Sequence, residues 1–374
     1  MQLQLTDEQR MLAETVKSLL DKRYDPNTRL ELLGSELGFS RELWRQYAEL
    51  GLLGLTIDER YGGAGMGAAE LSVVMEEFGR ALVLEPFIAT VVLGAQLLSA
   101  AGTPEQKSAL LPGVAAGETF LALAAAERDA RWSRTDIQTT AVQAGDGWAL
   151  TGEKTAVLGG DVADHVLVTA KLPDGEVGLF IADAAGLRRD SYRQQDGLGA
   201  ADLLFDSTPA ELLGDPVETG TQLEQVVDIA MAMLGWEAVG AMDRMLWLTV
   251  DYLKTRVQFG HPIAVFQALQ FRAADMYVSL EQGRSMAMMA RLALSDDDAA
   301  ARRRAVQAAK ILIDASARHV GQEAVQLHGG IGMTMEYPVG HYLKRTEVIA
   351  KTLADGDLLV SELGAAGGLL PPGS

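Results

Sequence analysis

Hydrophobic residues recur with a helical period over the first third of the chain. Thr6 and Gln9 have the spacing of a capping box, and the apolar residues that follow fall on one helical face. The same period returns at residues 43–53 and 71–78. Residues 86–104 are uncharged, but their glycines, polar residues and prolines predict a buried helix instead of a membrane span.

The pattern changes at Glu118 to short alternating or β-branched runs separated by turn residues. Two of these separators, 145–147 and 173–175, have the composition of tight turns between strands. After residue 215 the helical period returns in long stretches, and we expect helices over 226–257, 276–294 and 305–327. Long helices with short connections are typical of a four-helix bundle.

The chain is therefore predicted to be an α+β protein, mainly α, in three parts. Residues 1–117 form an N-terminal helical domain, 118–215 a middle antiparallel β domain and 216–363 a C-terminal four-helix bundle. Residues 364–374, rich in glycine and proline, are expected to form a disordered tail.

Composition and charge limit the kinds of molecule that this chain can be expected to bind. The 374 residues include 32 Lys+Arg and 51 Asp+Glu, and the formal net charge of −19 argues against binding to nucleic acid or to an anionic membrane surface. Cysteine is absent, which excludes disulfides, thiolate metal sites and a cysteine nucleophile. The five histidines lack metal-binding spacing, so no metal is expected. The charged N-terminus lacks the apolar core of a signal peptide, so we expect a cytoplasmic protein.

Residues 63–68 match the dinucleotide-binding pattern G-x-G-x-x-A. That pattern requires a preceding strand and a helix whose N-terminus meets a pyrophosphate. Here a helix precedes the glycines and no parallel-strand pattern follows, so a tight turn between helices is the preferred interpretation.

Two later segments carry candidate chemistry. Residues 256–263 end a helix in an arginine, an aromatic residue and a Gly-x-Pro turn, and Gln267 follows. Residues 326–332 end another helix in a glycine cluster, whose bare backbone admits a close ligand. An arginine fork, a ring and exposed N–H groups suit a diphosphate-linked adenine. Two ordinary helix ends are the alternative.

In order along the chain, these and other motifs resemble the acyl-CoA dehydrogenase family over nearly the full length. The matching segments are residues 50–55, 61–63, 76–80, 102–112, 256–260 with Gln267, and 326–332 with 336–338. The resemblance implies a helical domain, a β domain and a four-helix bundle, with FAD at a subunit interface. It also implies an acyl-CoA substrate, a glutamate that removes the α-proton, hydride transfer to the flavin and an electron-transfer flavoprotein as electron acceptor.

The adenine and diphosphate half of the family's flavin site is intact in this sequence. The resemblance assigns cofactor binding to Arg256, Phe259, Gln267, Gln326, Gly329 and Gly330. The half that meets the flavin ring is altered. The family's T-E-P-G-A-G-S-D is replaced by bulky and charged residues at 126–133, and Ala156 and Leu158 stand where a tryptophan and a threonine are expected.

Both positions that hold the catalytic glutamate in the family are alanine. Counting 26 residues back from Arg256 gives Ala230, and counting forward from Arg345 gives Ala354. Asp355 lies one residue from the second position and Asp228 two from the first, and a helix turns about 100° per residue, so neither is expected to point at the same spot. No catalytic residue is therefore assigned, with Asp355 as the weak substitute.

A chain with half a site is most simply one subunit of a heteromer. We expect a paralogous acyl-CoA dehydrogenase chain to bring the base, in a heterodimer or heterotetramer with a shared FAD. Paired chains of this kind occur in actinobacterial steroid degradation, which extends the expectation to steroid or other bulky CoA thioesters. The alternatives are a self-sufficient homo-oligomer using an acid such as Asp355, and a non-catalytic acyl-CoA binder, nucleotide binder or scaffold.

Overall fold

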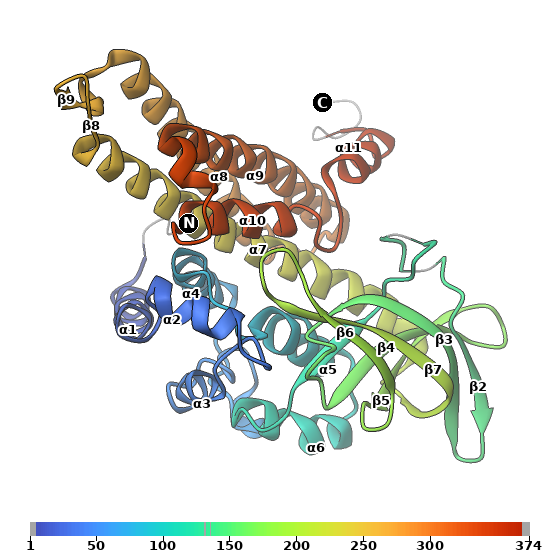
Figure 1. Cartoon of the computed structure of the whole chain (residues 1–374). Helices are drawn as coiled ribbons and strands as arrows, with labels where there is room; N and C mark the ends of the chain where they lie inside the picture. Colours follow the sequence, from blue (N-terminus) through green and yellow to red (C-terminus); the bar gives the residue numbers. More distant parts are fainter. Residues whose placement is uncertain (1–4, 131, 135, 369–374) are drawn as a thin grey trace. The chain divides into compact units, whose positions relative to one another are not determined.

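The computed structural model describes residues 5–130, 132–134 and 136–368, which fall into two compact units (Figure 1). One unit consists of Met1–Leu30, Ala68–Val83 and Met231–Ser374, and the other of Glu31–Gly67 and Leu84–Ala230. Each unit is thus assembled from segments that are distant in sequence. The domain boundaries proposed at 117 and 215 coincide with changes of element type but not with these units, so they stay predictions.

The first third of the chain is helical, as predicted. Its elements are α1 (Asp7–Arg23), α2 (Pro26–Leu33), α3 (Arg41–Glu49), η1 (Glu59–Tyr61), α4 (Ala68–Ala81), η2 (Ile88–Ala95), α5 (Gln96–Ala101) and α6 (Pro104–Ala115). The predicted capping box of α1 is present, because Thr6 N donates to Gln9 Oε1 at 3.1 Å and Gln9 N donates to Thr6 Oγ1 at 3.2 Å. The glycine-rich segment is a turn between η1 and α4, without a preceding strand.

The predicted buried helix at 86–104 is confirmed, with a difference in its winding. Every residue of η2 is buried, and η2 is a π-helix that continues into α5. A Cβ on Gly94 would lie 2.4 Å from Leu121 Cβ, so this glycine lets η2 lie close to strand β1. The wider π winding leaves no mark in a hydrophobic pattern, which is why the sequence did not predict it.

The middle of the chain forms a seven-stranded sheet. Its strands are β1 (Leu121–Ala124), β2 (Thr140–Ala144), β3 (Gly147–Leu158), β4 (His165–Lys171), β5 (Val177–Asp183), β6 (Arg188–Arg193) and β7 (Gly199–Leu212). The predicted turns 145–147 and 173–175 join antiparallel pairs, β2 with β3 and β4 with β5. Strand β1, however, pairs with β4 in parallel, from Leu121 opposite His165 to Ala124 opposite Val168. Turn residues reveal hairpins, whereas this long-range pairing has no local signal.

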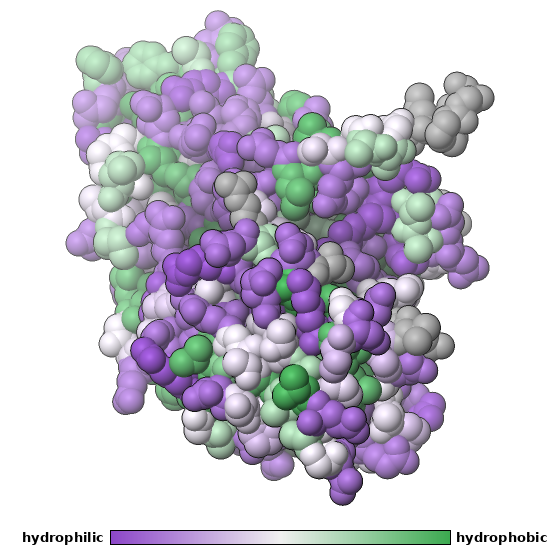
Figure 2. Space-filling view, turned by 90° about the vertical axis from the view of Figure 1, so that its right-hand side faces the viewer, coloured by the Kyte–Doolittle hydropathy of each residue, from purple (hydrophilic) through white to green (hydrophobic). Residues whose placement is uncertain are grey.

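Charged side chains are mostly exposed, and hydrophilic residues predominate on the face shown in Figure 2. An exception lies inside the sheet unit, where Lys154 and Glu127 are buried and their Nζ and Oε1 are 2.8 Å apart. Thr139 donates to the same Glu127 oxygen through its hydroxyl at 2.6 Å, and Thr169 accepts from Lys154 Nζ at 3.0 Å. Buried charges are tolerated when their hydrogen bonds are satisfied in this way.

The C-terminal part is helical, as predicted. It contains α7 (Pro216–Thr255), β8 (Val257–Gln258), β9 (His261–Pro262), η3 (Ile263–Val265), α8 (Gln267–Ala293), α9 (Ala299–His328), η4 (Gly329–Met333), α10 (Val339–Ile349) and α11 (Gly356–Ala365). Part of α7 is long and apolar enough to cross a membrane, but 89% of that window is buried in the fold, as in a core helix. Of the predicted tail 364–374, Gly364 and Ala365 end α11, and 369–374 lie outside the described residues.

Helices α4 and α7 touch backbone to backbone. A Cβ on Gly79 of α4 would lie 1.9 Å from the carbonyl oxygen of Glu237, and a Cβ on Gly240 of α7 would lie 1.9 Å from that of Glu76. Two facing glycines therefore permit the crossing. On the far side of this contact the Glu237 carboxylate binds the buried Arg345 of α10 at 2.6 and 2.7 Å.

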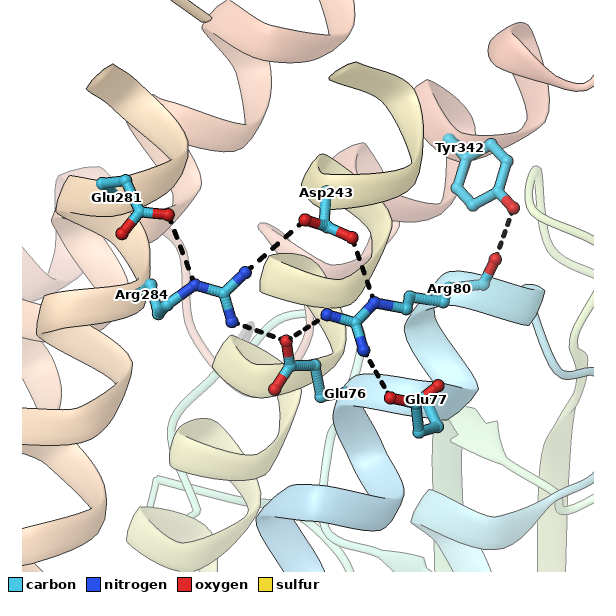
Figure 3. Close-up of polar contacts among 7 residues, drawn as sticks. All are labelled: Glu76, Glu77, Arg80, Asp243, Glu281, Arg284 and Tyr342. Carbon is cyan, nitrogen blue, oxygen red and sulfur yellow. Dashed lines mark hydrogen bonds and ion pairs between the residues drawn. The ribbon is translucent and has the colours of Figure 1, made fainter. Parts of the chain in front are cut away.

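Alternating charges surround the crossing (Figure 3). Glu76 Oε1 accepts from Arg80 Nη2 at 2.7 Å and from Arg284 Nη1 of α8 at 2.6 Å. Asp243 of α7 accepts from Arg80 Nε at 3.1 Å and lies 3.7 Å from Arg284 Nη2. The network therefore connects α4, α7 and α8, and it gives a physical role to the family-like segment 76–80.

We expect Gly79→Ala or Gly240→Ala to lower the free energy of unfolding by about 3 kcal/mol, because the new methyl group forces the two backbones apart. Gly220→Ala in the same helix α7 is the matched control. Its Cβ meets nothing within 4 Å, so the free energy of unfolding should rise by about 0.5–1 kcal/mol. Urea unfolding measures all three, and equal stability of the Gly240 and Gly220 variants would contradict the close crossing.

Acid should weaken the sheet unit through Glu127. Burial alone would raise the pKa of Glu127, but hydrogen bonds from Lys154, Thr139 and the main chain outweigh it and lower the pKa to about 2. The stabilisation is therefore present above about pH 4.5 and is lost as the pH falls toward 2.

We expect Glu127→Gln to reduce the difference in unfolding free energy between pH 7 and pH 3 by on the order of 2 kcal/mol. Glu153→Gln, which removes an exposed carboxylate of β3 next to Lys154, is the control for loss of one negative charge. A pH dependence that Glu127→Gln leaves unchanged would show that the buried pair does not control it.

Candidate functional site

A two-residue hairpin follows α7 at the end where α7 and α8 meet (Figure 1). Val257 pairs with Pro262 and Gln258 with His261, so Phe259 and Gly260 form the turn. Both turn residues have positive φ, 54° and 80°, as a type I′ turn requires. Glycine adopts this conformation freely, whereas for phenylalanine the left-handed region costs about 1–2 kcal/mol.

The ring of Phe259 is nearly fully accessible to solvent. It is 87% exposed, and the ring contact that the structure gives it is an edge-to-face one with Phe266, with centroids 6.0 Å apart. An apolar ring held in water on a strained backbone lowers the stability of the isolated chain. Such an arrangement is typical of a residue that binds a ligand or a second chain.

Arg256 lies at the base of this hairpin with an exposed side chain. Its main-chain N–H donates to Tyr252 O at 2.8 Å and its carbonyl accepts from Ile263 N at 2.8 Å. Within the described part of the chain, its guanidinium has no ion pair or hydrogen bond, although the sequence contains 51 carboxylates. Gln267, the first residue of α8, is also exposed. The guanidinium is thus available to an external anion.

The second predicted segment forms the end of α9. Gly329 has φ 61° and ψ −141°, a region that residues with a Cβ avoid. A Cβ on Gly329 or Gly330 would meet no atom within 4 Å, so the space over the turn is open. Gln326 and both glycines are exposed, and a ligand can reach their main chain.

An aromatic cluster brings the two segments together. The ring centroid of the buried His328 lies 4.5 Å from that of Tyr252 and 4.8 Å from that of Tyr337. Tyr252 is one helical turn before Arg256, and His328 directly precedes Gly329. The sequence analysis missed these three residues. Their only signal was position, because each lies in or next to a family-like motif.

The positions of the expected base contain no acid. Ala230 is fully buried and Ala354 is 5% exposed. Asp355 is the N-cap of α11, where its Oδ1 accepts from Leu358 N at 2.9 Å, and its Oδ2 is 3.7 Å from Lys351 Nζ. Asp228 is buried in α7. The Asp355 carboxylate therefore already has a structural partner on its own helix.

The backbone is strained at two positions where the family places chemistry. Ala156, in the position of the expected tryptophan, has φ 52° in a β-bulge between β3 and β7, and Leu353, next to Ala354, has φ 67°. Bulges are common next to active sites, where they redirect a side chain. In this chain the bulge at Ala156 directs only a methyl group.

A polar cluster occupies the surface around this bulge. Asp202 accepts from Ala156 N at 2.9 Å and from the Tyr192 hydroxyl at 3.0 Å, and it lies 3.5 Å from Arg128 Nη2. Partial burial and the Asp202 carboxylate raise the pKa of Tyr192 to about 12. Arg128 belongs to the altered segment 126–133, in which Arg131 lies outside the described residues. Charged, mutually paired side chains fit a flat apolar ring poorly.

The two halves of the predicted flavin site therefore differ in fit. The adenine and diphosphate half offers an exposed guanidinium without a partner in residues 5–130, 132–134 and 136–368, an exposed ring and an open glycine turn, which fit a dinucleotide. The ring half offers the Arg128–Asp202 pair and the methyl group of Ala156, which do not. Among the described residues, no group of three or more His, Asp or Glu side chains could hold a metal ion.

A cavity of about 510 Å³ lies elsewhere in the unit that contains the hairpin. Its lining includes Trp247, His341 and the paired side chains of Arg80 and Asp243. None of the residues predicted to bind the cofactor or to act as base lines this cavity. It is separate from the candidate site.

Two family models match this chain, one in its N-terminal part and one in its C-terminal part. The family model for the acyl-CoA dehydrogenase N-terminal domain matches residues 6–118, and that for the C-terminal domain matches residues 222–356. The acyl-CoA dehydrogenase IpdE2 of Mycobacterium tuberculosis is 33% identical over 349 residues, which cover 93% of each chain.

Solved structures of similar proteins match this chain over nearly its whole length. A chain of a variant of the Tcur3481-Tcur3483 steroid ACAD superposes with a TM-score of 0.86 at 33% identity, covering 96% of this chain and 97% of that one. A chain of the ChsE4-ChsE5 complex from Mycobacterium tuberculosis gives a TM-score of 0.90 at 25% identity, covering 99% and 100%. With both terminal domains matched and the similarity extending over almost all of its length, this chain belongs to the acyl-CoA dehydrogenase family.

Proposed function

We propose that this chain is the nucleotide-binding, non-catalytic subunit of a heteromeric FAD-dependent acyl-CoA dehydrogenase, which introduces a double bond between the α and β carbons of an acyl-CoA thioester. One observation carries the proposal: Arg256, which has no side-chain partner among the described residues, lies close in sequence to the strained, exposed Phe259 in a chain whose base positions are Ala230 and Ala354. A cation and a ring that both face solvent suit a dinucleotide bound mainly by another chain.

Each exposed residue then has a role toward the cofactor. Arg256 would pair with the diphosphate, because a guanidinium can donate two parallel hydrogen bonds to phosphate oxygens. The open main chain at Gly330 would approach the same group, since the Gly329 N–H already donates to Gln326 O, and Phe259 would pack on the adenine side. FAD, when bound, accepts the hydride from the β carbon. The set proposed for the nucleotide is Arg256, Phe259, Gln267, Gln326, Gly329 and Gly330.

A paralogous acyl-CoA dehydrogenase chain would supply the rest of the site. It would bring the glutamate that removes the α-proton and the surface that meets the flavin ring, where this chain has Arg128 and Asp202. An electron-transfer flavoprotein would reoxidise the flavin. The similar chains in the Tcur3481-Tcur3483 and ChsE4-ChsE5 structures, each named as a pair, support a paired assembly.

The acyl group is proposed to be bulky. The Tcur3481-Tcur3483 protein is described as a steroid ACAD, and it shares 33% identity with this chain over nearly the whole length of both. A ring-containing CoA thioester is the substrate class that follows. Its recognition would depend mainly on the partner chain, because the base and its surroundings belong to that chain.

Purification of this chain alone and together with a paralogue that has glutamate at a base position tests the proposal directly. We expect flavin and acyl-CoA oxidation only in the complex, because the lone chain cannot enclose the flavin ring. A yellow, active protein from this chain alone would support the homo-oligomer instead, and a complex without flavin would support a scaffold.

Arg256→Ala should weaken FAD binding by the complex about 10- to 100-fold, since a charged hydrogen-bonded contact to phosphate contributes roughly 1.5–3 kcal/mol. Lys254→Ala, which removes another exposed cation two residues earlier, should leave FAD affinity nearly unchanged. Flavin release followed by fluorescence measures both. Equal affinities for the two variants would remove the role assigned to Arg256.

Asp355→Asn separates the heteromer from the self-sufficient enzyme. Asparagine can cap α11 as aspartate does, but it cannot act as a base. We expect the rate of acyl-CoA oxidation by the complex to stay within about twofold of wild type. A fall of about 100-fold or more, the usual contribution of a general base, would identify Asp355 as catalytic.

A further inference from the structure

Three segments of the chain meet at His328. This buried residue ends α9, its ring contacts Tyr252 of α7, and Tyr337 reaches it from the segment that precedes α10. The Tyr337 hydroxyl lies 3.2 Å from His328 Nε2. His328 Nδ1 lies 2.7 Å from the carbonyl oxygen of Ala324, one turn earlier in α9. Both ring nitrogens therefore have partners.

These partners determine the protonation of the ring. A carbonyl oxygen can only accept, so Nδ1 must carry the hydrogen and donate to Ala324. In the neutral ring Nε2 is then an acceptor, and the Tyr337 hydroxyl donates to it. Burial lowers the pKa of His328, which favours this neutral form. A main-chain hydrogen bond with Leu248 also acts on the ring, so Tyr337 is one of several groups that hold His328.

The glycine turn next to His328 begins the 3-10 helix η4, and its Gly329 N–H donates to Gln326 O. Gly329 and Gly330 are exposed, and no side chain lies within 4 Å of the Cβ positions that they lack. Gly329 also has a backbone conformation, φ 61° and ψ −141°, that residues with a Cβ avoid, so it has no side chain of its own to anchor it. The buried His328, which directly precedes the turn, supports it from the protein interior. The contact between the Tyr337 hydroxyl and His328 Nε2 in turn holds that histidine.

We propose that His328 is a positioning residue for the nucleotide, which fixes the Gly329–Gly330 turn for binding and is itself fixed by the Tyr337 hydroxyl. This inference rests on the proposed function and assigns a role beyond the residues that touch the cofactor. It also links the segments 326–332 and 336–338, because Tyr337 of the second contacts His328 of the first. Tyr252 extends the same support to the helical turn that carries Arg256.

The complex of this full-length chain with its paralogous partner is the material for the test, and FAD dissociation with ADP as the competing probe is the measurement. We expect Tyr337→Phe, which removes one hydroxyl group, to weaken FAD and ADP binding about threefold to tenfold. His328→Asn should have a similar effect, because asparagine can still donate to Ala324 but is too short to reach Tyr337.

A double-mutant cycle tests whether the two residues act through each other. If Tyr337 acts through His328, adding Tyr337→Phe to His328→Asn should cause no further loss of affinity. Tyr342→Phe is the matched control. It removes the hydroxyl of a buried tyrosine, which donates to the carbonyl of Arg80, so it should lower the melting temperature without changing nucleotide affinity.

The possible results separate the two proposals. Wild-type nucleotide affinity in both the Tyr337→Phe and His328→Asn complexes, while Arg256→Ala weakens binding, would overturn the positioning role alone. Equal weakening by Tyr342→Phe would also overturn it, because the effect would then follow general stability. No loss of affinity in the Arg256→Ala complex would overturn the proposed function, and this inference with it.

Discussion

The direct backbone contact between α4 and α7 is the constraint on which the rest of the helical unit depends. Gly79 and Gly240 leave no room for a Cβ, so the two helices approach as closely as main chains allow. That distance places Glu237 where it can bind Arg345 of α10, and it places Arg80 between Glu76 and Asp243. Since α7 ends at Thr255, directly before Arg256, the crossing also sets the position of the helix that leads to the proposed nucleotide site.

Much of this arrangement is predictable from local patterns. Thr6 and Gln9 cap α1 because a side chain and a main-chain group three residues apart can bond reciprocally, and such a motif needs no knowledge of the fold. Arg256 and Gly329 could be found for a similar reason, since each terminates a helix in a recognisable sequence. The assignment of their function, however, needed the family resemblance as well as the residues.

Other features depend on contacts between distant segments and have no local signal. The parallel pairing of Leu121 with His165 joins strands separated by two others, and the π winding of η2 looks like any buried helix in sequence. The bond between Tyr337 and His328 also escapes a motif search, although both residues belong to motifs, because spacing says nothing about which side chains meet. Asp355 is the opposite case. Its spacing from Arg345 made it a candidate base, but in the structure it caps the start of α11 by accepting from Leu358 N.

The exposed ring of Phe259 affects how the isolated chain behaves in solution. Phe259 is 87% exposed and Met333, the last residue of η4, is 77% exposed, so a copy without the proposed partner presents both to water. Exposed apolar groups of this kind favour self-association. If the chain pairs as proposed, a surplus of it over the partner would therefore self-associate more readily than the complex.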